Sequence, residues 1–271
     1  MNIKLSHLVS FGLGTGAFAL YHNAKAVAKQ NTPFRRQWER HLLSTLQALE
    51  LRAHTGEPMP LVYVALGDSA AQGLGASRFE EGYVPRVAAG LKAATGRDVA
   101  LLNLSLSGGV AASVLGTQLP QLEGLRVAGK QLMPDVVTLD IGGNDVGIGE
   151  LSPEEFGGQM SAIADRIPKP AFIADIPTFK PLRSEKRASE MSRHIERSAQ
   201  TDQISLIRLE ELSNSLTTYE YISRYHAGDM FHPNSPWYHR WSQLFVNSIA
   251  DGLGFESVDM AHVPEWEPWL G

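Results

Sequence analysis

Short apolar stretches alternate with helix-like segments from residue 61 to residue 252, and this alternation limits the fold more than any other feature of the sequence. Buried strands that alternate with helices are typical of a parallel sheet covered by helices on both faces. The sequence therefore predicts an α/β fold. The expected strands are 61–66, 99–104, 136–141, 171–176 and 204–209, and the expected helices are 83–95, about 111–131, 153–166, 184–200 and 236–252.

Polar residues or glycines follow three of these strands shortly after they end. Ser69 follows the first strand, where we expect the chain to turn into a helix, Gly108 follows the second and Asn144 the third. Ligands of open parallel sheets bind at the carboxyl ends of the strands. We therefore expect one crevice to collect all three residues.

A loop late in the chain, 228–234, carries Asp229 and His232 three residues apart. A neutral imidazole can take a proton from a serine hydroxyl at neutral pH and return it to a leaving group. A carboxylate beside the other ring nitrogen can stabilise the imidazolium. Pro233 restricts His232 to extended or turn conformations, which predicts a loop. With Ser69 as nucleophile, these residues indicate acyl-transfer hydrolysis.

Three groups are candidates to stabilise a developing oxyanion: the backbone N–H of Ser69, the backbone N–H of Gly108 and the side-chain amide of Asn144. Each also has a plain structural alternative. Asp68 or Ser69 can cap a helix, Gly108 can begin one, and the segment 142–145 can be an ordinary turn. No residue is specific by itself, so the interpretation depends on their combination.

The composition excludes several other chemistries. The chain has no cysteine, which excludes disulfides, thiolate zinc sites and cysteine nucleophiles. Its net charge of −5 argues against a nucleic-acid partner. Metal binding by His226, Asp229 and His232 stays open as an alternative, although this spacing on a loop does not by itself make a ligand set. We expect no metal and no cofactor.

Four blocks of this sequence, in their order along the chain, resemble the SGNH hydrolases, also called GDSL-type lipases and esterases. The blocks are Gly67–Ser69, Asn103–Gly108, Gly142–Asp145 and Asp229–His232. One departure is Ala70, where the family name expects leucine, and this change touches no catalytic atom.

The resemblance implies a flavodoxin-like three-layer α/β/α sandwich with a five-stranded parallel sheet. It also implies roles for the candidate residues: Ser69 as nucleophile, His232 as base and Asp229 as the partner of His232. The oxyanion hole would use Ser69 N–H, Gly108 N–H and the Asn144 side chain. The implied reaction is hydrolysis of carboxylic esters with small or medium acyl groups through an acyl-enzyme intermediate.

Other functions stay open beside this one. The same site could serve a lysophospholipase, a thioesterase or a carbohydrate O-acetyl esterase. From a different class, a non-catalytic ligand-binding module would keep the crevice without the activity. The expected partner is a small-molecule ester, and the sequence does not predict the oligomeric state.

The resemblance covers about residues 61–252. Before it, Thr32 as N-cap and Pro33 in the first turn predict a helix over 33–53. We divide the chain into an N-terminal apolar segment and helix (1–55), an SGNH hydrolase domain (56–254) and a C-terminal tail (255–271).

The first residues contain a mildly apolar stretch, 5–21. As a helix it would reach about 26 Å, slightly short of the roughly 30 Å of a bilayer core. It can be a membrane-associated or anchored segment, a signal cleaved at an A-x-A-like site, or a helix packed on the domain. Basic residues from Lys25 to Arg40 favour a cytoplasmic or membrane-associated location over export.

Overall fold

The computed structural model describes the backbone of residues 5–271 and the side chains from residue 24 onward. Its main sheet has the order β2-β1-β5-β6-β7, and every neighbouring pair is parallel. This is the flavodoxin-like order, so the predicted fold class is confirmed. The strands are β1 (Leu61–Gly67), β2 (Val99–Asn103), β5 (Val136–Asp140), β6 (Ala171–Ala174) and β7 (Ile204–Ile207).

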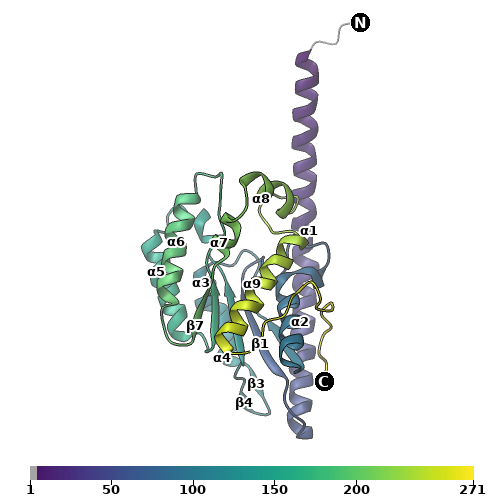
Figure 1. The fold of residues 1–271 in the computed structure, drawn as a ribbon, viewed down its shortest axis with the longest axis vertical. Coiled ribbons are helices and arrows are strands. Elements are labelled where there is room, and N and C mark those ends of the chain that lie inside the picture. Colours follow the sequence, from purple (N-terminus) through teal and green to yellow (C-terminus); the bar gives the residue numbers. More distant parts are fainter. Residues whose placement is uncertain (1–4) are drawn as a thin grey trace.

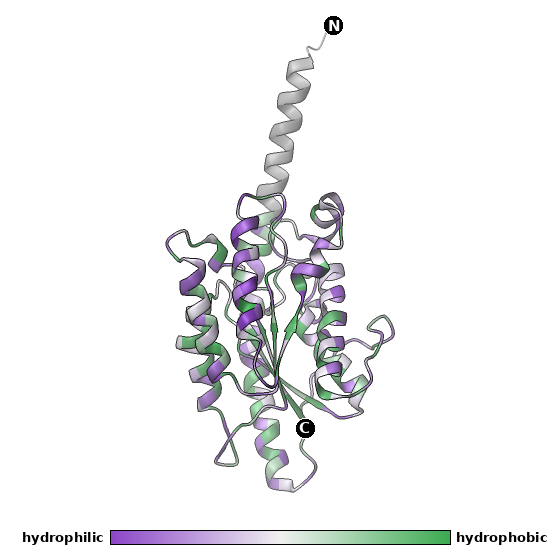
Figure 2. Cartoon of the chain, turned by 60° about the vertical axis from the view of Figure 1, so that its left-hand side comes forward, coloured by the Kyte–Doolittle hydropathy of each residue, from purple (hydrophilic) through white to green (hydrophobic). Residues whose placement is uncertain are grey.

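Helices cover both faces of this sheet (Figure 1). On one face lie α2 (Tyr83–Thr95) and α9 (Ser235–Leu253), and on the other lie α5 (Pro153–Arg166) and α6 (Glu185–Ser198). The strands are hydrophobic along their length, whereas the outer sides of the helices are more hydrophilic (Figure 2). Burial on both faces explains why the strands are apolar rather than alternating.

The first helix, α1 (Leu5–Thr55), runs through the position at which we expected a helix to begin. The predicted start at Thr32 and Pro33 is therefore wrong. A proline inside a helix removes one backbone donor, here the partner of the Lys29 carbonyl. Both Lys29 and Pro33 are exposed, so water can satisfy that carbonyl and the helix continues.

Helix α1 lies along β2, the strand at one edge of the sheet. Trp38 and Leu49 are buried, and they belong to the hydrophobic cores on opposite faces of the sheet. His41 Nε2 lies 3.0 Å from the carbonyl oxygen of Leu101 in β2. A covered edge strand cannot pair with another chain, so α1 closes the sheet on this side.

The tail after α9 packs back onto α1. Trp266 is only 7% exposed, and its ring lies 6.3 Å from that of Trp38. Near the end of the chain, the Arg52 guanidinium lies 6.0 Å from the centre of the Trp269 ring. The tail thus contributes an aromatic side chain to the core of the domain.

The predicted helix over about 111–131 is wrong in its second half. Three short helical pieces replace its start, and a two-residue turn then leads into a hairpin. Ala128 and Gly129 have φ angles of 48° and 73°, the left-handed values that a type I′ hairpin turn requires and a helix excludes. The observed elements are α3 (Ala111–Ser113), the π-helical turn η2 (Val114–Gln118), α4 (Leu119–Gly124), β3 (Arg126–Val127) and β4 (Lys130–Gln131).

Two helices between β7 and α9 were not predicted. They are α7 (Leu209–Asn214) and α8 (Thr218–Tyr225). The start of α8 has a local sequence signal, because the Thr217 side chain accepts from Glu220 N–H and the Glu220 side chain reaches back to the Thr217 N–H. The two shortest helices are η1 (Phe79–Glu81) and η3 (Asp145–Gly147).

The backbone of the apolar stretch 5–21 belongs to α1, but its side chains lie outside the described residues. In the part of the chain that the structure describes, no helix combines the length and the apolar character needed to cross a bilayer.

Candidate active site

Ser69 follows β1 in a compact turn rather than a helix. The expected helix at this point is absent from the described structure, because Gly73 and Gly75 have φ angles of 84° and 93°, and the next α-helix begins only at Tyr83. The Ser69 carbonyl accepts from Leu74 N–H at 3.0 Å, which closes the turn. Ser69 itself is only 4% exposed.

The turn before Ser69 depends on Gly67. Its φ of 145°, together with a Cβ position only 2.3 Å from the Asp140 carbonyl oxygen, leaves no room for a side chain. The Gln118 side chain then fixes both polar groups of Gly67, accepting from its N–H and donating to its carbonyl, each at 2.8 Å. Gln118 was not predicted from the sequence, because it lies 51 residues away in no recognisable motif.

His232 lies between Ser69 and Asp229. Its Nε2 is 2.9 Å from Ser69 Oγ, and its Nδ1 is 2.5 Å from Asp229 Oδ2. The other carboxylate oxygen of Asp229 accepts from the N–H groups of Phe231, at 3.1 Å, and His232, at 3.0 Å. The structure therefore brings together three residues that the sequence separates by up to 163 positions.

The charge state of Asp229 follows from these contacts. Partial burial raises the pKa of its carboxyl, but hydrogen bonds from the His232 ring, His232 N–H and Phe231 N–H, with the charge of His232, outweigh that effect. The net result is a pKa below the ordinary value. Asp229 is thus a carboxylate that can hold the Nδ1 proton of His232.

The loop that carries His232 is held from two sides. Ala227 N–H donates to the His232 carbonyl at 2.7 Å. Gly75 approaches so closely that a Cβ there would lie 2.3 Å from the Pro233 carbonyl oxygen. The side chain of Gln30 in α1 binds this same turn, accepting from Gly75 N–H at 2.8 Å and donating to the next carbonyl at 2.9 Å.

The candidate oxyanion donors lie close to one another in the fold. Asn144 Nδ2 donates to Asp68 Oδ2 at 3.1 Å and to the Gly109 carbonyl at 2.9 Å. Gly108, immediately before Gly109, is exposed and has a φ of 73°. A Cβ at Gly108 would meet no atom within 4 Å, so its backbone is open to an approaching molecule.

Asp145, next to Asn144, supports this region although the sequence suggested no role for it. Its carboxylate accepts from Ala111 N–H with oxygen distances of 3.0 and 3.2 Å, which links the third strand end to α3. Burial raises the pKa of Asp145, an effect that the hydrogen bond from Ala111 N–H partly offsets.

Asp68 is the buried carboxyl nearest to these groups. Burial raises its pKa to about 6, while the hydrogen bond from Ala70 N–H and the charge of His232 act in the opposite direction. At neutral pH the group is mainly ionised, so it accepts the hydrogen from the Asn144 amide. This contact orients the Asn144 side chain beside Ser69.

A cavity of about 310 Å³ opens beside Ser69 and His232. This volume is at the lower end of the range for small-molecule sites. Its lining is mainly apolar and comes from the strand ends, the β6–α6 loop, α8, the loop before α9, and α9 itself. The lining residues are Asp68, Ser69, Ala70, Asp140, Gly143, Pro177, Thr178, Phe179, Lys180, Pro181, Leu182, Tyr221, Ile222, His226, Met230, Phe231, His232, Pro233, Trp237 and Trp241.

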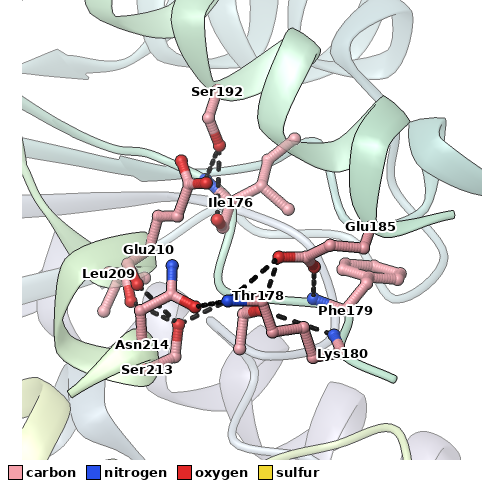
Figure 3. Close-up of polar contacts among 10 residues, drawn as sticks. All are labelled: Ile176, Thr178, Phe179, Lys180, Glu185, Ser192, Leu209, Glu210, Ser213 and Asn214. Atoms are coloured by element: carbon pink, nitrogen blue, oxygen red, sulfur yellow. Dashed lines mark hydrogen bonds and ion pairs between the residues drawn. The ribbon is translucent and has the colours of Figure 1, made fainter. Parts of the chain in front are cut away.

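One wall of the cavity is the loop 177–182, which is held by polar contacts to α6 and α7 (Figure 3). Thr178 N–H donates to Ser213 Oγ at 2.8 Å, and Thr178 Oγ1 donates to Glu185 Oε1 at 2.8 Å. Phe179 N–H donates to the other oxygen of the Glu185 carboxylate. Glu185 therefore fixes the part of the loop that faces the cavity.

The metal alternative can be compared with the geometry. His226 Nδ1 lies 3.0 Å from the Tyr221 carbonyl oxygen, so that ring nitrogen faces the backbone of α8. Across the described residues, no group of three His, Asp or Glu side chains is arranged to hold a metal ion.

Comparison with known proteins agrees with this architecture. The model of the GDSL-like Lipase/Acylhydrolase family matches residues 65–240, which is more than half of the chain. No curated protein matches the sequence.

Solved structures share the fold at low sequence identity. The structure of TesA has a TM-score of 0.57 and 21% identity, and covers 70% of this chain and 99% of its own. LAE5, an α/β hydrolase enzyme from the metagenome of Lake Arreo, has a TM-score of 0.54, 20% identity, and coverage of 69% and 94%. The acetylxylan esterase Axe2 from Geobacillus stearothermophilus has a TM-score of 0.53, 15% identity, and coverage of 74% and 99%. The chain belongs to the GDSL-like lipase/acylhydrolase family.

Proposed function

We propose that this protein is a serine esterase that hydrolyses carboxylic esters with small or medium acyl groups. Ser69 is the nucleophile, His232 the general base and Asp229 the residue that orients the imidazole. The observation that carries the proposal is the continuous hydrogen-bonded series from Ser69 Oγ through His232 to Asp229 at 2.9 and 2.5 Å. Distances of this size allow proton transfer without rearrangement.

In the first half of the reaction, Ser69 Oγ attacks the ester carbonyl and His232 Nε2 takes the hydroxyl proton. The charge that develops on the carbonyl oxygen is stabilised by the N–H groups of Ser69 and Gly108 and by the Asn144 amide. His232 then returns the proton to the departing alkoxide, which leaves as the alcohol. Water repeats the sequence on the acyl-enzyme and releases the acid.

The size and character of the cavity support the proposed substrate class. A cavity of about 310 Å³ with apolar side chains such as Phe179, Ile222 and Phe231 suits an alkyl portion of modest length. Leu182, Met230 and Phe231 are 61%, 47% and 48% exposed at this site, which favours a thioesterase or lysophospholipase as the second candidate function.

The first test is turnover of p-nitrophenyl acetate by the wild type and by Ser69→Ala. The substitution should lower kcat by about 10⁶, because the members of a triad act as a unit. Ser77→Ala, an exposed serine in the same turn region, is the matched control and should keep wild-type turnover. Equal rates for wild type and Ser69→Ala would reject the proposal.

A fluorophosphonate probe separates an enzyme from a binding module. A nucleophilic Ser69 should be labelled covalently, and the label should be absent from Ser69→Ala. A protein that binds esters without reacting would stay unlabelled. A series of esters from about two to sixteen carbons, within the reach of pockets of this class, then separates the esterase from the two candidates with longer acyl chains.

A further inference from the structure

The inner end of the cavity carries buried polar atoms that have no partner. Asp140 Oδ2, Trp237 Nε1 and Trp241 Nε1 each lack a hydrogen bond to any described residue. All three side chains line the same cavity as Ser69. They are 7%, 1% and 2% exposed, so bulk water does not reach them freely.

The backbone explains why space remains over Asp140. In the sheet register, Asp140 lies directly beside Gly67 of β1 and Ala174 of β6. Neither neighbour has a side chain large enough to cover the carboxyl. The indoles of Trp237 and Trp241, one turn apart on α9, provide the opposite wall of the cavity.

An unpaired polar group in a protein interior costs about 1–3 kcal/mol, and native proteins contain few of them. Here three fall in one cavity of a single site, and Tyr83 adds a fourth. Its buried hydroxyl also has no hydrogen-bond partner among the described residues, and it acts on the Asp140 carboxyl. Such a cluster is expected where a ligand completes the hydrogen bonding.

The identity of these groups restricts the ligand. An indole N–H only donates, so Trp237 and Trp241 require an acceptor atom. A carboxyl at Asp140 disfavours an anion, and two N–H donors disfavour an ammonium group. A plain alkyl end would leave every one of these atoms unpaired. A hydroxyl group can both accept from an indole and donate to the carboxyl.

We propose that the inner end of this cavity is a hydroxyl-binding subsite formed by Asp140, Trp237 and Trp241, so that the preferred substrate is an ester whose buried alkyl portion ends in a hydroxyl group. This inference rests on the proposed esterase function and names the substrate class of the same site. Water bound in the subsite is the rival explanation, and the experiments below distinguish the two.

The kinetic experiment compares p-nitrophenyl esters of unbranched acids of about four to ten carbons, a range suited to a small-molecule pocket, with their ω-hydroxy counterparts. The hydroxyl should raise kcat/KM about tenfold or more at one chain length, because the partner groups are at a fixed distance from Ser69. A ratio of one or less at every length would overturn the proposal.

Substitutions identify the groups responsible. Trp241→Phe removes the N–H and keeps an aromatic ring, so it should reduce the hydroxyl preference about three- to tenfold. Trp266→Phe is the matched control, because Trp266 is buried against α1 and not in this cavity, and it should keep the wild-type ratio. An unchanged ratio in Trp241→Phe and also in Trp237→Phe would count against the subsite.

A binding measurement keeps the inference testable if the esterase proposal fails. The chain has five tryptophans, whose indole N–H signals can be followed by ¹⁵N NMR and assigned with Trp→Phe variants. 1,6-Hexanediol should shift the signals of Trp237 and Trp241 more than 1-hexanol does, because only the diol carries a second hydroxyl. Equal shifts from both alcohols would mean that water alone fills the subsite, whatever the outcome with p-nitrophenyl acetate.

Discussion

The amide of Asn144 uses both of its hydrogens in the site without substrate, one on Asp68 and one on the Gly109 carbonyl. An oxyanion beside Ser69 would compete with Asp68 for the first hydrogen. Because Asp68 is buried and its pKa is already raised to about 6, its hold on that hydrogen is weaker than that of a fully solvated charge would suggest. Asp68 therefore orients Asn144 without preventing it from turning to the substrate.

Removal of this donor gives the first prediction at the residue scale. Asn144→Ala should lower kcat for p-nitrophenyl acetate by about 10²–10³, the usual effect of losing one oxyanion donor. KM should change much less, because the contact strengthens only as charge develops. Equal losses in kcat for Asn144→Ala and Ser69→Ala would contradict an auxiliary role for the amide.

Asp175, after β6, gives a prediction for stability against pH. Its carboxyl is 6% exposed, and burial raises its pKa to about 7, although the hydrogen bond from Glu210 N–H opposes this. The folded protein therefore keeps the proton at pH values where the unfolded chain has released it. Stability from this group is full below about pH 4 and is lost as pH rises through about 7, by about 4 kcal/mol in total.

The check is the free energy of urea unfolding for wild type and Asp175→Asn at pH 4 and pH 8. The variant cannot lose this proton, so its stability relative to wild type should increase by about 4 kcal/mol between the two pH values. A constant difference would show that the folded and unfolded states bind the Asp175 proton equally.

At this scale the sequence predicted the placement of the reacting groups well and that of their supports poorly. Serine, histidine and carboxylate are rare enough in combination for their order to be informative. Gln118 and Gln30 act through ordinary amide hydrogen bonds to backbone in distant turns. Nothing local distinguishes them from surface glutamines, so only the assembled fold identifies them.

Among the elements, the loop 177–182 depends on a single side chain in α6. Glu185 accepts from Thr178 and from Phe179 N–H, both in residues that line the cavity. The wall of the cavity is therefore as ordered as the first turn of α6. This arrangement couples the shape of the substrate site to a residue outside it.

Loss of that contact should weaken substrate binding. Glu185→Ala is expected to raise KM for p-nitrophenyl butyrate about three- to tenfold, the effect of one or two lost hydrogen bonds, with a smaller change in kcat. Glu190→Ala in the same helix is the control, since its ion pair is only with Lys186, at 3.8 Å. A KM that changes equally in both variants would contradict a specific role of Glu185.

The elements with strong periodicity were predicted closely, and the failures have local causes. Helices α2 and α5 begin and end at the expected residues. The segment after Ala111 has apolar residues at helical spacing, but the left-handed turn at Ala128 and Gly129 ends any helix there. Alanine is a poor signal for that conformation, so the hairpin was not visible in the sequence.

For the whole molecule, α1 belongs to the folding unit from at least Trp38 onward. The Trp38 ring packs 4.3 Å from Phe79, and its Nε1 donates to the Gln72 carbonyl at 3.1 Å. Gln72 and Phe79 both lie between β1 and α2. The division of the chain at residue 55 therefore describes the sequence pattern and not a break in the core.

Trp38→Ala should lower the free energy of unfolding by about 3–5 kcal/mol, because a buried indole leaves a cavity. Leu43→Ala in the same helix is the control, since Leu43 is 62% exposed and should change stability by no more than about 0.5 kcal/mol. Urea unfolding followed by circular dichroism measures both. An unchanged midpoint in Trp38→Ala would mean that α1 unfolds independently of the sheet.

The grip of Gln30 on the turn that abuts Pro233 joins the two ends of the chain at the reacting histidine. Engineers who graft a foreign leader onto residues 56–254, preserving all four family blocks, would discard this clasp. Such chimaeras should retain their chemistry on paper and yet work slowly, because an N-terminal helix that no sequence motif marks is part of what keeps the imidazole in register.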